Sequence, residues 1–322
     1  MKYYLLLKLC LLVCLSNFSW ATQLTTPLDY LKAMQQAHRQ LNYELLYIIQ
    51  KDDDVESLRY RHAFWEGKEF AQLLRLDYAR EEIILRDDIV GYFGEFQPFS
   101  LQTNHIIDNL PSVLHSQFSN LDDYYFVDAG KMRTANRLAR VIRIVPRDDF
   151  RYQYELWIDE ENHLLLRSDL LDRDRQVLEQ FRVIQSGNDE QLLRIVEPIN
   201  ALLFPTLLSN KPQEVPAQVN WRMNWVPRGF KPIESSPNHL TLFTGEQVES
   251  QRYSDGLFSF TVYFAENKGV TFDDQFWREG KTSIYSQTVD QTDIIIIGDI
   301  PLVSARHILQ KIEKIQPLVE KE

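Results

Sequence analysis

The sequence predicts a β-rich α+β protein, with a large antiparallel sheet in its N-terminal part and a smaller α+β domain after a linker. Three observations support this prediction. Short runs that alternate apolar and polar residues follow one another with tight acidic turns, prolines interrupt the pattern between 197 and 219, and alternation resumes beyond them. Short connections between alternating strands are typical of an antiparallel meander. The apolar face of such a sheet must be buried, either under helices or by its own curvature.

The first 21 residues have the pattern of a secretory signal peptide. Two lysines flank an apolar core, and Ser19-Trp20-Ala21 supplies small residues at the two positions that a signal peptidase reads. Both cysteines, Cys10 and Cys14, lie inside this segment, and Val13 before Cys14 disfavours a lipid anchor. No later stretch reaches about 18 consecutive apolar residues, the length that a membrane span needs. We therefore expect a soluble chain without disulfides that is exported to the periplasm.

The composition indicates a folded, acidic chain. Apolar residues make up 44% of the sequence and aromatic residues 12%, which is typical of packed domains rather than of disorder. The formal net charge is −11, so the chain as a whole has no attraction for nucleic acids or anionic membranes. Several arginines follow one another closely between 133 and 151, and we interpret them as a solvated strand face paired with neighbouring acids. No nucleic-acid partner is expected.

The pattern of the N-terminal part predicts one helix followed by a series of strands. Thr26-Pro27 is a suitable start for a helix, whose apolar residues recur at helical spacing up to Leu41. The alternation fails between Leu110 and Tyr125, where a helical or irregular insertion is expected. Strands are predicted at 43–49, 55–61, 69–76, 80–86 and 89–93 and, as a meander, through 137–184. The larger domain is therefore assigned to residues 22–196 and the linker to residues 197–220.

The C-terminal part, residues 221–322, has the pattern of a smaller α+β domain. Ser254-Asp255-Gly256 lies between two alternating runs, which predicts a hairpin because glycine tolerates a positive φ. The isoleucine-rich segment 293–298 is predicted as a buried strand. The apolar residues of 301–315 recur on one side of a helix, so this segment is predicted as a final amphipathic helix.

Catalytic and metal-binding patterns are missing from the sequence. Its seven histidines are scattered without the H-E-x-x-H spacing of a zinc site, and neither a G-x-S-x-G elbow nor a phosphate-binding glycine motif occurs. The acidic clusters Asp52-Asp53-Asp54 and Asp172/Asp174 fall in expected hairpin turns, where aspartate is favoured for turn geometry alone. We therefore expect no catalytic residue, no bound metal and no cofactor. A periplasmic hydrolase with two converging carboxylates is the weaker alternative.

Aromatic and aliphatic residues of the N-terminal part suit two different structures. They can fill an ordinary packed core, or they can line an apolar cavity inside a curved sheet that holds a hydrophobic ligand. The candidate residues for such a lipid cavity are Leu74, Leu76, Tyr92, Phe93, Tyr152, Tyr154 and Leu156.

Several long segments, spread over most of the chain, match the pattern of one known protein family. In the N-terminal part they are Leu41–Glu44, Val55–Ala63, Asp108–Ser112, Arg140–Arg143, Asp169–Asp174 and Leu178–Ile184. In the C-terminal part they are Trp225–Phe230 and Tyr253–Phe260. By these segments the chain resembles the RseB/MucB family, the periplasmic regulators of the sigma-E envelope-stress response.

This resemblance implies an architecture and a partner. The larger domain is expected to look like the lipoprotein carriers LolA and LolB, an unclosed antiparallel β-barrel covered by helices with an apolar interior. The smaller domain, with the linker, is expected to bind the periplasmic part of the membrane-bound anti-sigma factor RseA and to shield it from the protease DegS. Lipopolysaccharide or mislocalised lipoprotein, bound by its acyl chains, is expected to release RseA.

The residues expected at the partner surface are mostly aromatic, because aromatic side chains dominate interface energetics. The same side chains suit the core of the small domain equally well, so both interpretations stay open. An exposed aromatic surface also favours self-association, which predicts a homo-oligomer. A lipid or lipoprotein carrier is the alternative function. The candidate partner-binding residues are Trp225, Phe230, Tyr253, Leu257 and Phe258.

Overall fold

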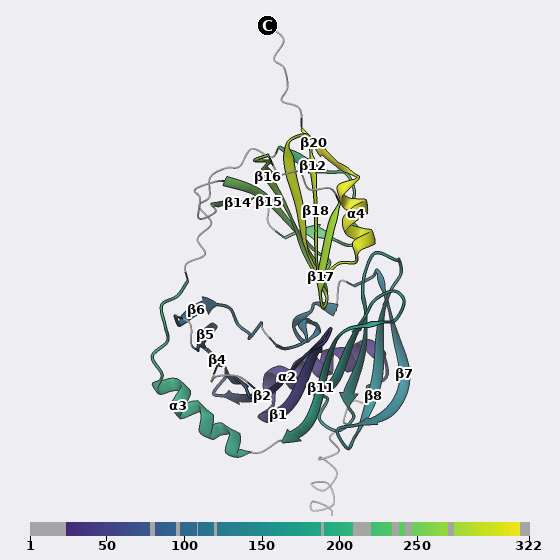
Figure 1. Cartoon of the computed structure of the whole chain (residues 1–322). Helices are drawn as coiled ribbons and strands as arrows, with labels where there is room; N and C mark the ends of the chain where they lie inside the picture. Colours follow the sequence, from purple (N-terminus) through teal and green to yellow (C-terminus); the bar gives the residue numbers. More distant parts are fainter. Residues whose placement is uncertain are drawn as a thin grey trace, which may run out of the picture.

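The computed structural model describes residues 24–77, 81–94, 97–107, 109–118, 121–187, 190–208, 220–233, 238–241, 247–269 and 274–315. The predicted signal peptide, residues 1–21, and both cysteines lie outside the described residues. Figure 1 shows two β-rich domains in contact, a larger one with the N-terminal strands and a smaller one with the C-terminal helix. The predicted limits of the domains and of the linker stay predictions, and residues 209–219 of that linker lie outside the described residues.

The larger domain is built on one antiparallel sheet of eleven strands. The strands are β1 (Tyr43–Lys51), β2 (Asp54–Trp65), β3 (Lys68–Arg75), β4 (Glu82–Arg86), β5 (Ile89–Phe93), β6 (Phe99–Gln102), β7 (Tyr124–Thr134), β8 (Arg137–Pro146), β9 (Gln153–Asp159), β10 (Leu165–Leu171) and β11 (Val177–Gly187). Their order is β6-β5-β4-β3-β2-β1-β11-β10-β9-β8-β7. The end strands β6 and β7 are not paired with each other, so the sheet curves without closing (Figure 1). The predicted unclosed antiparallel barrel is confirmed, and we call this sheet the half-barrel.

Side-chain alternation in β1 shows why the half-barrel has an apolar concave face. Tyr43, Leu45, Tyr47 and Ile49 are at most 3% exposed, whereas the residues between them are partly exposed. Successive side chains of a strand point to opposite faces, so this period of two commits one face to the core. β1 lies in the middle of the sheet, paired with β2 on one side and with β11 on the other.

Helix α2 (Pro27–Gln40) lies on the concave face, as the sequence predicted. A capping box fixes its first turn: the Thr26 hydroxyl accepts a hydrogen bond from the Asp29 backbone N–H, and the Asp29 carboxylate accepts one from the Thr26 backbone N–H. Such a cap stabilises a helix by about 1 kcal/mol. Residues 109–118, with the short helix η1 (Ser112–His115), lie beside α2. We call α2 and residues 109–118 together the cover.

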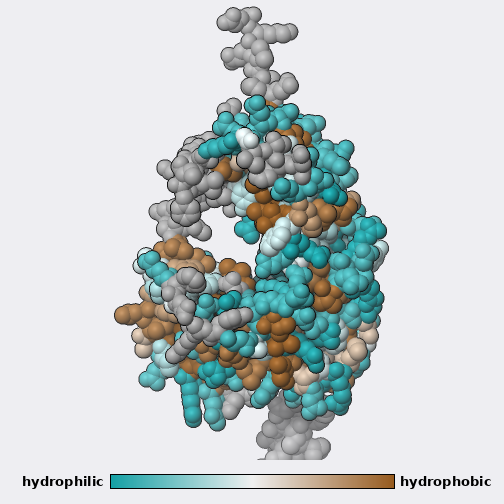
Figure 2. Space-filling model, in the orientation of Figure 1, coloured by the Kyte–Doolittle hydropathy of each residue, from teal (hydrophilic) through white to brown (hydrophobic). Residues whose placement is uncertain are grey.

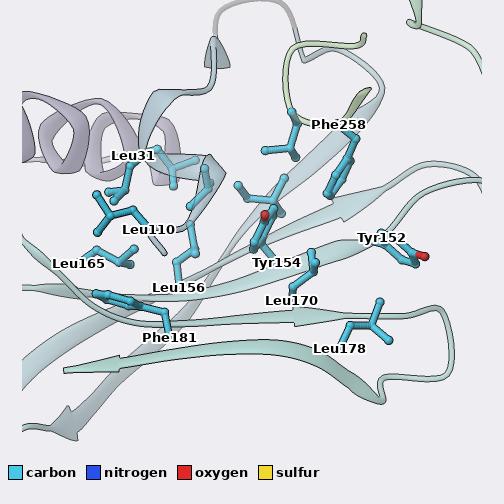
Figure 3. Packing of buried hydrophobic residues seen from close by; sticks show 14 of the residues in the cluster. Leu31, Leu110, Tyr152, Tyr154, Leu156, Leu165, Leu170, Leu178, Phe181 and Phe258 are labelled. Atoms are coloured by element: carbon cyan, nitrogen blue, oxygen red, sulfur yellow. The ribbon is translucent and has the colours of Figure 1, made fainter. Parts of the chain in front are cut away.

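Side chains of the cover fill the concave face. Figure 3 shows Leu31 of α2 and Leu110 of residues 109–118 packed against Leu156, Leu165 and Phe181 of the sheet. All five are buried, and Leu31 and Leu156 have no exposed surface. Burying a leucine or phenylalanine side chain stabilises a fold by roughly 1.5–3 kcal/mol, so this contact is the main core of the larger domain.

A second, smaller core lies on the convex face of the half-barrel. The chain passes there through η3 (Glu190–Ile195) and α3 (Val196–Ala201). Val196 and Ile199 pack on Ala63, Phe70 and Ile84 of strands β2 to β4. The predicted linker therefore begins inside a helix that is packed on the larger domain.

Residues 202–208, which we call the strap, run on from α3 along β5 and β6. Ser100 of β6 donates its backbone N–H to the Thr206 carbonyl at 3.0 Å and accepts a hydrogen bond from the Leu208 N–H at 2.8 Å. The guanidinium group of Arg86 lies 4.4 Å from the ring centre of Phe204. Arg86 Nη1 also donates to the carbonyl oxygens of Ile199 at 2.6 Å, Asn200 at 3.0 Å and Leu202 at 3.0 Å.

The smaller domain has a seven-stranded antiparallel sheet in the order β13-β15-β16-β19-β18-β17, with β14 also paired to β15. These strands are β13 (Lys231–Pro232), β14 (Asn238–Thr241), β15 (Gln247–Ser254), β16 (Ser259–Glu266), β17 (Gln275–Glu279), β18 (Thr282–Val289) and β19 (Thr292–Gly298). β12 (Trp221–Met223) and β20 (Ile312–Lys314) form a separate pair, and α4 (Leu302–Leu309) packs near β18. The predicted hairpin and the predicted strand at 293–298 are confirmed.

The prediction of a helix through 301–315 was wrong in its second half. α4 ends at Leu309, and Ile312 pairs with Met223 as the start of β20. The helical spacing of the apolar residues extended to Ile312, but that residue packs against the core from a strand. β20 supplies hydrogen-bond partners to the backbone of β12. A longer helix would leave those β12 groups to solvent.

The arginine run between 133 and 151 is mostly the acid-paired strand face that the sequence suggested. Arg140 contacts Glu160 at 2.9 Å and Asp128 at 3.0 Å, and Arg143 contacts Glu155 at 3.3 Å. The exception in this run is Arg151, whose side chain is fully buried where the two domains meet.

Candidate functional site at the domain junction

Three aromatic rings join the two domains. Phe258, at the end of the β15–β16 turn, stacks on Tyr154 of β9 with ring centres 5.7 Å apart and an angle of 3° between the planes. Tyr152 meets Phe258 edge to face at 6.0 Å, and its hydroxyl donates to the Ile300 carbonyl at 3.0 Å. All three rings are at most 2% exposed, and Figure 3 shows Phe258 above the two tyrosines. Aromatic pairs of this geometry add about 0.5–1.5 kcal/mol to their area burial.

The local sequence 254–258 fixes the position of Phe258. Asp255 Oδ1 accepts hydrogen bonds from the backbone N–H groups of Leu257 at 2.9 Å and Phe258 at 2.8 Å. Gly256 has φ +95°, in the left-handed region that glycine tolerates best. The Ser254 hydroxyl closes the turn by donating to the Phe258 carbonyl at 2.8 Å. The turn is therefore preorganised, and it projects Leu257 and Phe258 toward the larger domain.

A buried arginine crosses the same junction. Arg151 is 1% exposed, and its Nε lies 3.4 Å from Oδ2 of Asp255 in the smaller domain. Its Nη2 lies 3.4 Å from Asp148, and its Nη1 donates to the Asp123 carbonyl oxygen at 3.3 Å. The Tyr124 hydroxyl donates to Asp255 Oδ2 at 2.6 Å. Each buried charge thus has an opposite charge or a hydrogen-bond donor beside it, but within the described residues Arg151 Nε and Nη2 make no hydrogen bond, so the ion pairs alone compensate that part of the guanidinium group.

The charge on Asp255 also acts on Tyr124. Burial, and then the neighbouring Asp255 carboxylate, raise the pKa of Tyr124 well above its usual value. Its hydroxyl therefore stays protonated and keeps donating to Asp255. We call Arg151, Asp255, Tyr124, Asp148 and Asp123 the junction network.

Arg228 and Gly229, just before Phe230, contact Asp123 of the junction network. Arg228 Nε contacts Asp123 Oδ1 at 2.9 Å. Gly229 has φ +90°, and a Cβ atom there would lie 2.6 Å from Asp123 Oδ2. Any other residue would therefore clash with the carboxylate and strain the backbone.

Two further contacts lie at the edges of the junction. On one edge, Trp225 meets Phe150 at 4.9 Å and His307 at 4.2 Å between ring centres. On the other, Lys281 Nζ lies 3.1 Å from Asp299 and donates to the Ser112 hydroxyl of the cover at 3.2 Å. Burial lowers the pKa of Lys281, but Tyr154, Asp299 and Glu179 raise it more, so the group stays charged.

The structure places the five predicted partner residues in two settings. Leu257 and Phe258 lie at the junction and are at most 5% exposed. Phe230 and Tyr253 pack on Phe260 inside the smaller domain, each with ring centres 5.3 Å from it. Trp225 is half-buried at the edge of the junction. The five residues are therefore close to one another and mostly covered, and their contact with a partner stays a prediction.

The structure separates the predicted lipid-cavity residues into three settings. Tyr154 and Leu156 lie on β9 and Tyr152 lies just before it, all three buried under the smaller domain and the cover. Tyr92 and Phe93 line a pocket of about 120 Å³ on strands β4 to β6. Of the remaining pair, Leu74 is half-buried on β3, and Leu76 is 48% exposed.

Within the described residues Tyr92 packs against the main core, whereas Phe93 packs against the smaller core on the convex face. Sequence reasoning did not single out Arg151, Tyr124, Asp255 or Lys281 as site residues. A charged residue gives no local signal of burial when its partners come from distant segments.

Two absences hold for the residues that the structure describes. They contain no grouping of three or more His, Cys, Asp or Glu side chains suited to a metal ion. No helix among them is long and apolar enough to cross a membrane.

These features define a class of protein: two β-rich domains, an unclosed half-barrel and a smaller α+β unit, joined by a buried polar and aromatic junction. The chain belongs to the MucB/RseB family. The sequence model of the MucB/RseB N-terminal domain matches residues 26–206, and that of the MucB/RseB C-terminal domain matches residues 215–313.

Relatives and solved structures agree with this assignment. The sigma-E factor regulatory protein RseB of Haemophilus influenzae is 39% identical over 307 residues, which cover 95% of this chain and 96% of the relative. The sigma factor AlgU regulatory protein MucB of Pseudomonas aeruginosa is 27% identical over 310 residues, covering 89% and 91%. The fold is that of MucB in the complex structure of Pseudomonas aeruginosa MucA/MucB, with a TM-score of 0.70, 24% identity, and coverage of 90% and 99%.

Proposed function

We propose that this chain binds the periplasmic segment of an RseA-type anti-sigma factor and acts as a negative regulator of the sigma-E envelope-stress response. One observation carries the proposal: a relative named a sigma-E factor regulatory protein is 39% identical over nearly the full length of both chains. The match spans both domains, not one module alone. The fold of MucB in a complex with MucA supports the same partner class.

The site of action and the mode of action are part of this proposal. The leader pattern of residues 1–21 and a remaining chain free of cysteine favour the periplasm. The names of the relatives favour a regulator that acts by binding rather than by catalysis. A lipid or lipoprotein carrier is not favoured, because the near full-length relatives are named as regulators.

For the partner surface we propose the smaller domain together with the strap. Leu203 is 90% exposed, Leu208 50% and Leu207 43%, an unusual concentration of exposed leucine on a segment that is otherwise fixed to β6. Figure 2 shows an opening between the two domains with hydrophobic residues at its large-domain rim. An extended apolar patch beside an opening suits a peptide segment of a partner.

The five partner residues predicted from the sequence have a modified role in this proposal. Leu257 and Phe258 fix the angle between the domains, and Phe230 and Tyr253 brace the smaller domain behind them. They therefore set the geometry of the partner surface rather than form its outermost layer.

Release by lipopolysaccharide or mislocalised lipoprotein is the finer part of the proposal. Phe93, beside the pocket on β4 to β6, meets Phe204 of the strap edge to face at 6.0 Å. An acyl chain that enters this pocket would displace the strap. A ligand that prefers the partner-free state shifts binding only by its differential affinity for the two states.

The test is calorimetry of the mature chain, Thr22 to Glu322, with the purified periplasmic segment of the anti-sigma factor from the same organism. We expect binding that lipopolysaccharide weakens. Leu203→Ser should weaken binding at least tenfold without loss of stability, because Leu203 is 90% exposed. Ile184→Ser is the matched control, a change at another exposed aliphatic residue, 62% exposed on β11, and should bind like the wild type.

The outcomes separate the parts of the proposal. No binding by the wild type would overturn the regulator and leave a carrier as the better account. Binding that is indifferent to lipopolysaccharide would remove only the release step. If Leu203→Ser and Ile184→Ser weaken binding equally, or if neither weakens it, the strap is not part of the partner surface.

A further inference from the structure

Four of the seven histidines, scattered in the sequence, lie together inside the larger domain. His38 comes from α2, His62 from β2, and His105 and His115 from the segment that contains η1. The ring centre of His38 lies 5.4 Å from that of His115 and 6.1 Å from that of His62. His105 stacks on His115 with ring centres 3.9 Å apart. We call these four residues the histidine cluster.

The histidine cluster holds the cover against the sheet. His38 is 4% exposed, and its Nδ1 lies 2.5 Å from the hydroxyl of Tyr43 on β1. His62 is fully buried, and its Nδ1 donates to the Leu41 carbonyl, just after α2, at 2.6 Å. His115 closes η1 and packs edge to face on His38. Each contact joins the cover to the half-barrel or one part of the cover to another.

Other titratable and charged groups face the cluster from each packed element. Tyr43 on β1 and Tyr60 on β2 are both buried beside His38 and His62. Glu69 on β3 lies 3.2 Å from His62 Nε2. The same carboxylate lies 3.9 Å from Arg39 Nε at the end of α2. Glu69 thus lies between the guanidinium group of Arg39 and the imidazole of His62.

Burial disfavours a proton on His38, His105 and His115. Burial lowers the pKa of His38 well below its usual value, and the neighbours His115, His62, His105 and Arg39 lower it further. Burial, then His105 and Arg39, lower the pKa of His115 to about 3. Burial is also the largest cause of the lowered pKa of His105. Since an unfolded histidine titrates near pH 6.5, these residues contribute stability above that pH, and the contribution is lost as the pH falls below it.

We propose that the histidine cluster is a proton-sensing element: in mild acid it loosens the cover, α2 and residues 109–118, from the concave face of the half-barrel. The covered face carries large apolar residues such as Tyr43, Leu45 and Tyr47. Loosening the cover would therefore expose an apolar surface in an acidified periplasm. The inference does not depend on the proposed partner.

The experiment is hydrogen exchange by mass spectrometry on the mature chain at pH 7.5 and 5.5, corrected for the intrinsic exchange rate at each pH. Each histidine held neutral in the folded state should raise the opening equilibrium constant by about tenfold per pH unit below its unfolded pKa. With three such residues, we expect the corrected exchange rate of α2 and residues 109–118 to be about a hundredfold or more higher at pH 5.5 than at pH 7.5. Protection in β16 and β19 of the smaller domain should change little.

The diagnostic variant is His105→Gln/His115→Gln, at positions that are only partly buried. In this variant the acid-induced increase in exchange rate should fall to about tenfold, because only His38 keeps a strongly lowered pKa. The matched control is His163→Asn, at a histidine outside the cluster, where asparagine suits the φ of +63°. It should keep the wild-type response.

Two results would overturn the proposal. One is an equal pH response in the double variant, the control and the wild type. The other is an acid response of the wild type spread evenly over both domains. The second result is decisive even if the double variant fails to fold, because it needs the wild-type chain alone.

Discussion

The histidine cluster inside the half-barrel and the junction network between the domains are both buried, polar and assembled from distant segments. In the junction network, Arg151 contacts Asp255 through Nε and Asp148 through Nη2, so opposite charges compensate one another. In the histidine cluster, four like groups lie together and Glu69 contacts only His62, so the cluster is compatible with burial only while most of it is neutral.

This difference in composition predicts a difference in behaviour. A compensated charge pair fixes two domains in one arrangement and fails when one partner is removed. A neutral cluster of histidines loses stability when it is protonated, because the added charges are buried. The next three predictions test that contrast, from the largest expected effect to the smallest.

Removing Arg151 should give the largest loss. Arg151→Met leaves Asp255 and its neighbours buried without their counter-charge, which should cost about 4 kcal/mol of stability. Urea denaturation of the mature chain measures this loss. Arg173→Met is the control: Arg173 is 59% exposed and 3.8 Å from an exposed Asp149, so its replacement should change stability by less than about 0.5 kcal/mol.

A second substitution sharpens the Arg151 prediction. Asp255→Asn in the Arg151→Met background removes the orphaned charge, while the side-chain carbonyl can still accept from Leu257 and Phe258. The double variant should therefore be more stable than Arg151→Met alone. A double variant that is further destabilised would show that the charge pair is not the source of the loss.

Removing Phe258 tests the apolar half of the junction. Phe258→Ala empties the space above Tyr154 and should cost about 3 kcal/mol. The larger domain should stay folded, so the loss should appear as domain separation in small-angle X-ray scattering, with weaker binding of the anti-sigma segment. Tyr154→Phe, which keeps the stack and loses only the contact with Ser112, is the control and should cost about 1 kcal/mol. An unchanged scattering profile in Phe258→Ala would contradict a role in fixing the domains.

Removing the helix cap tests the cover without touching its histidines. Thr26→Ala deletes the capping box of α2 and should cost about 1 kcal/mol. Because the cap does not titrate near neutral pH, protection of α2 should fall equally at pH 7.5 and 5.5. Thr25→Ala, at the preceding exposed threonine, is the milder comparison, because it removes only the 3.4 Å hydrogen bond from the Thr25 hydroxyl to Asp29 Oδ2 and keeps the capping box. A change in the pH response of Thr26→Ala would mean that the acid effect arises from helix stability rather than from the histidines.

Most of the fold was predictable because it is written in local patterns. Alternation of apolar residues located nine of the eleven strands of the half-barrel but missed β6 and β7, and Thr26-Pro27 located the start of α2. The prediction failed at Ile312, where helical spacing continued but the residue pairs in a strand with Met223. A pattern of apolar residues reports burial, and two kinds of element can bury the same residue.

The site was predictable only in part. Phe258 and Tyr154 were both singled out, but as members of a partner surface and of a lipid cavity, and the structure stacks them on each other. Arg151 was grouped with a solvated arginine face, because a sequence gives no sign that one arginine of a run is fully buried. Arg137, Arg140 and Arg143 lie on strand β8. Arg151 lies in the loop between β8 and β9, which contacts the smaller domain.

The β-rich class, most of the strands and the family could be read from the sequence alone, because each of these depends on neighbours along the chain or on long matching segments. Only the tertiary structure decided which polar residues are buried together. His38, His62 and His115 meet because α2, β2 and residues 109–118 pack on one another, and Arg151 meets Asp255 because two domains touch. The energy of a buried polar group depends on the partners that surround it in space, and those partners come from segments that local patterns do not connect.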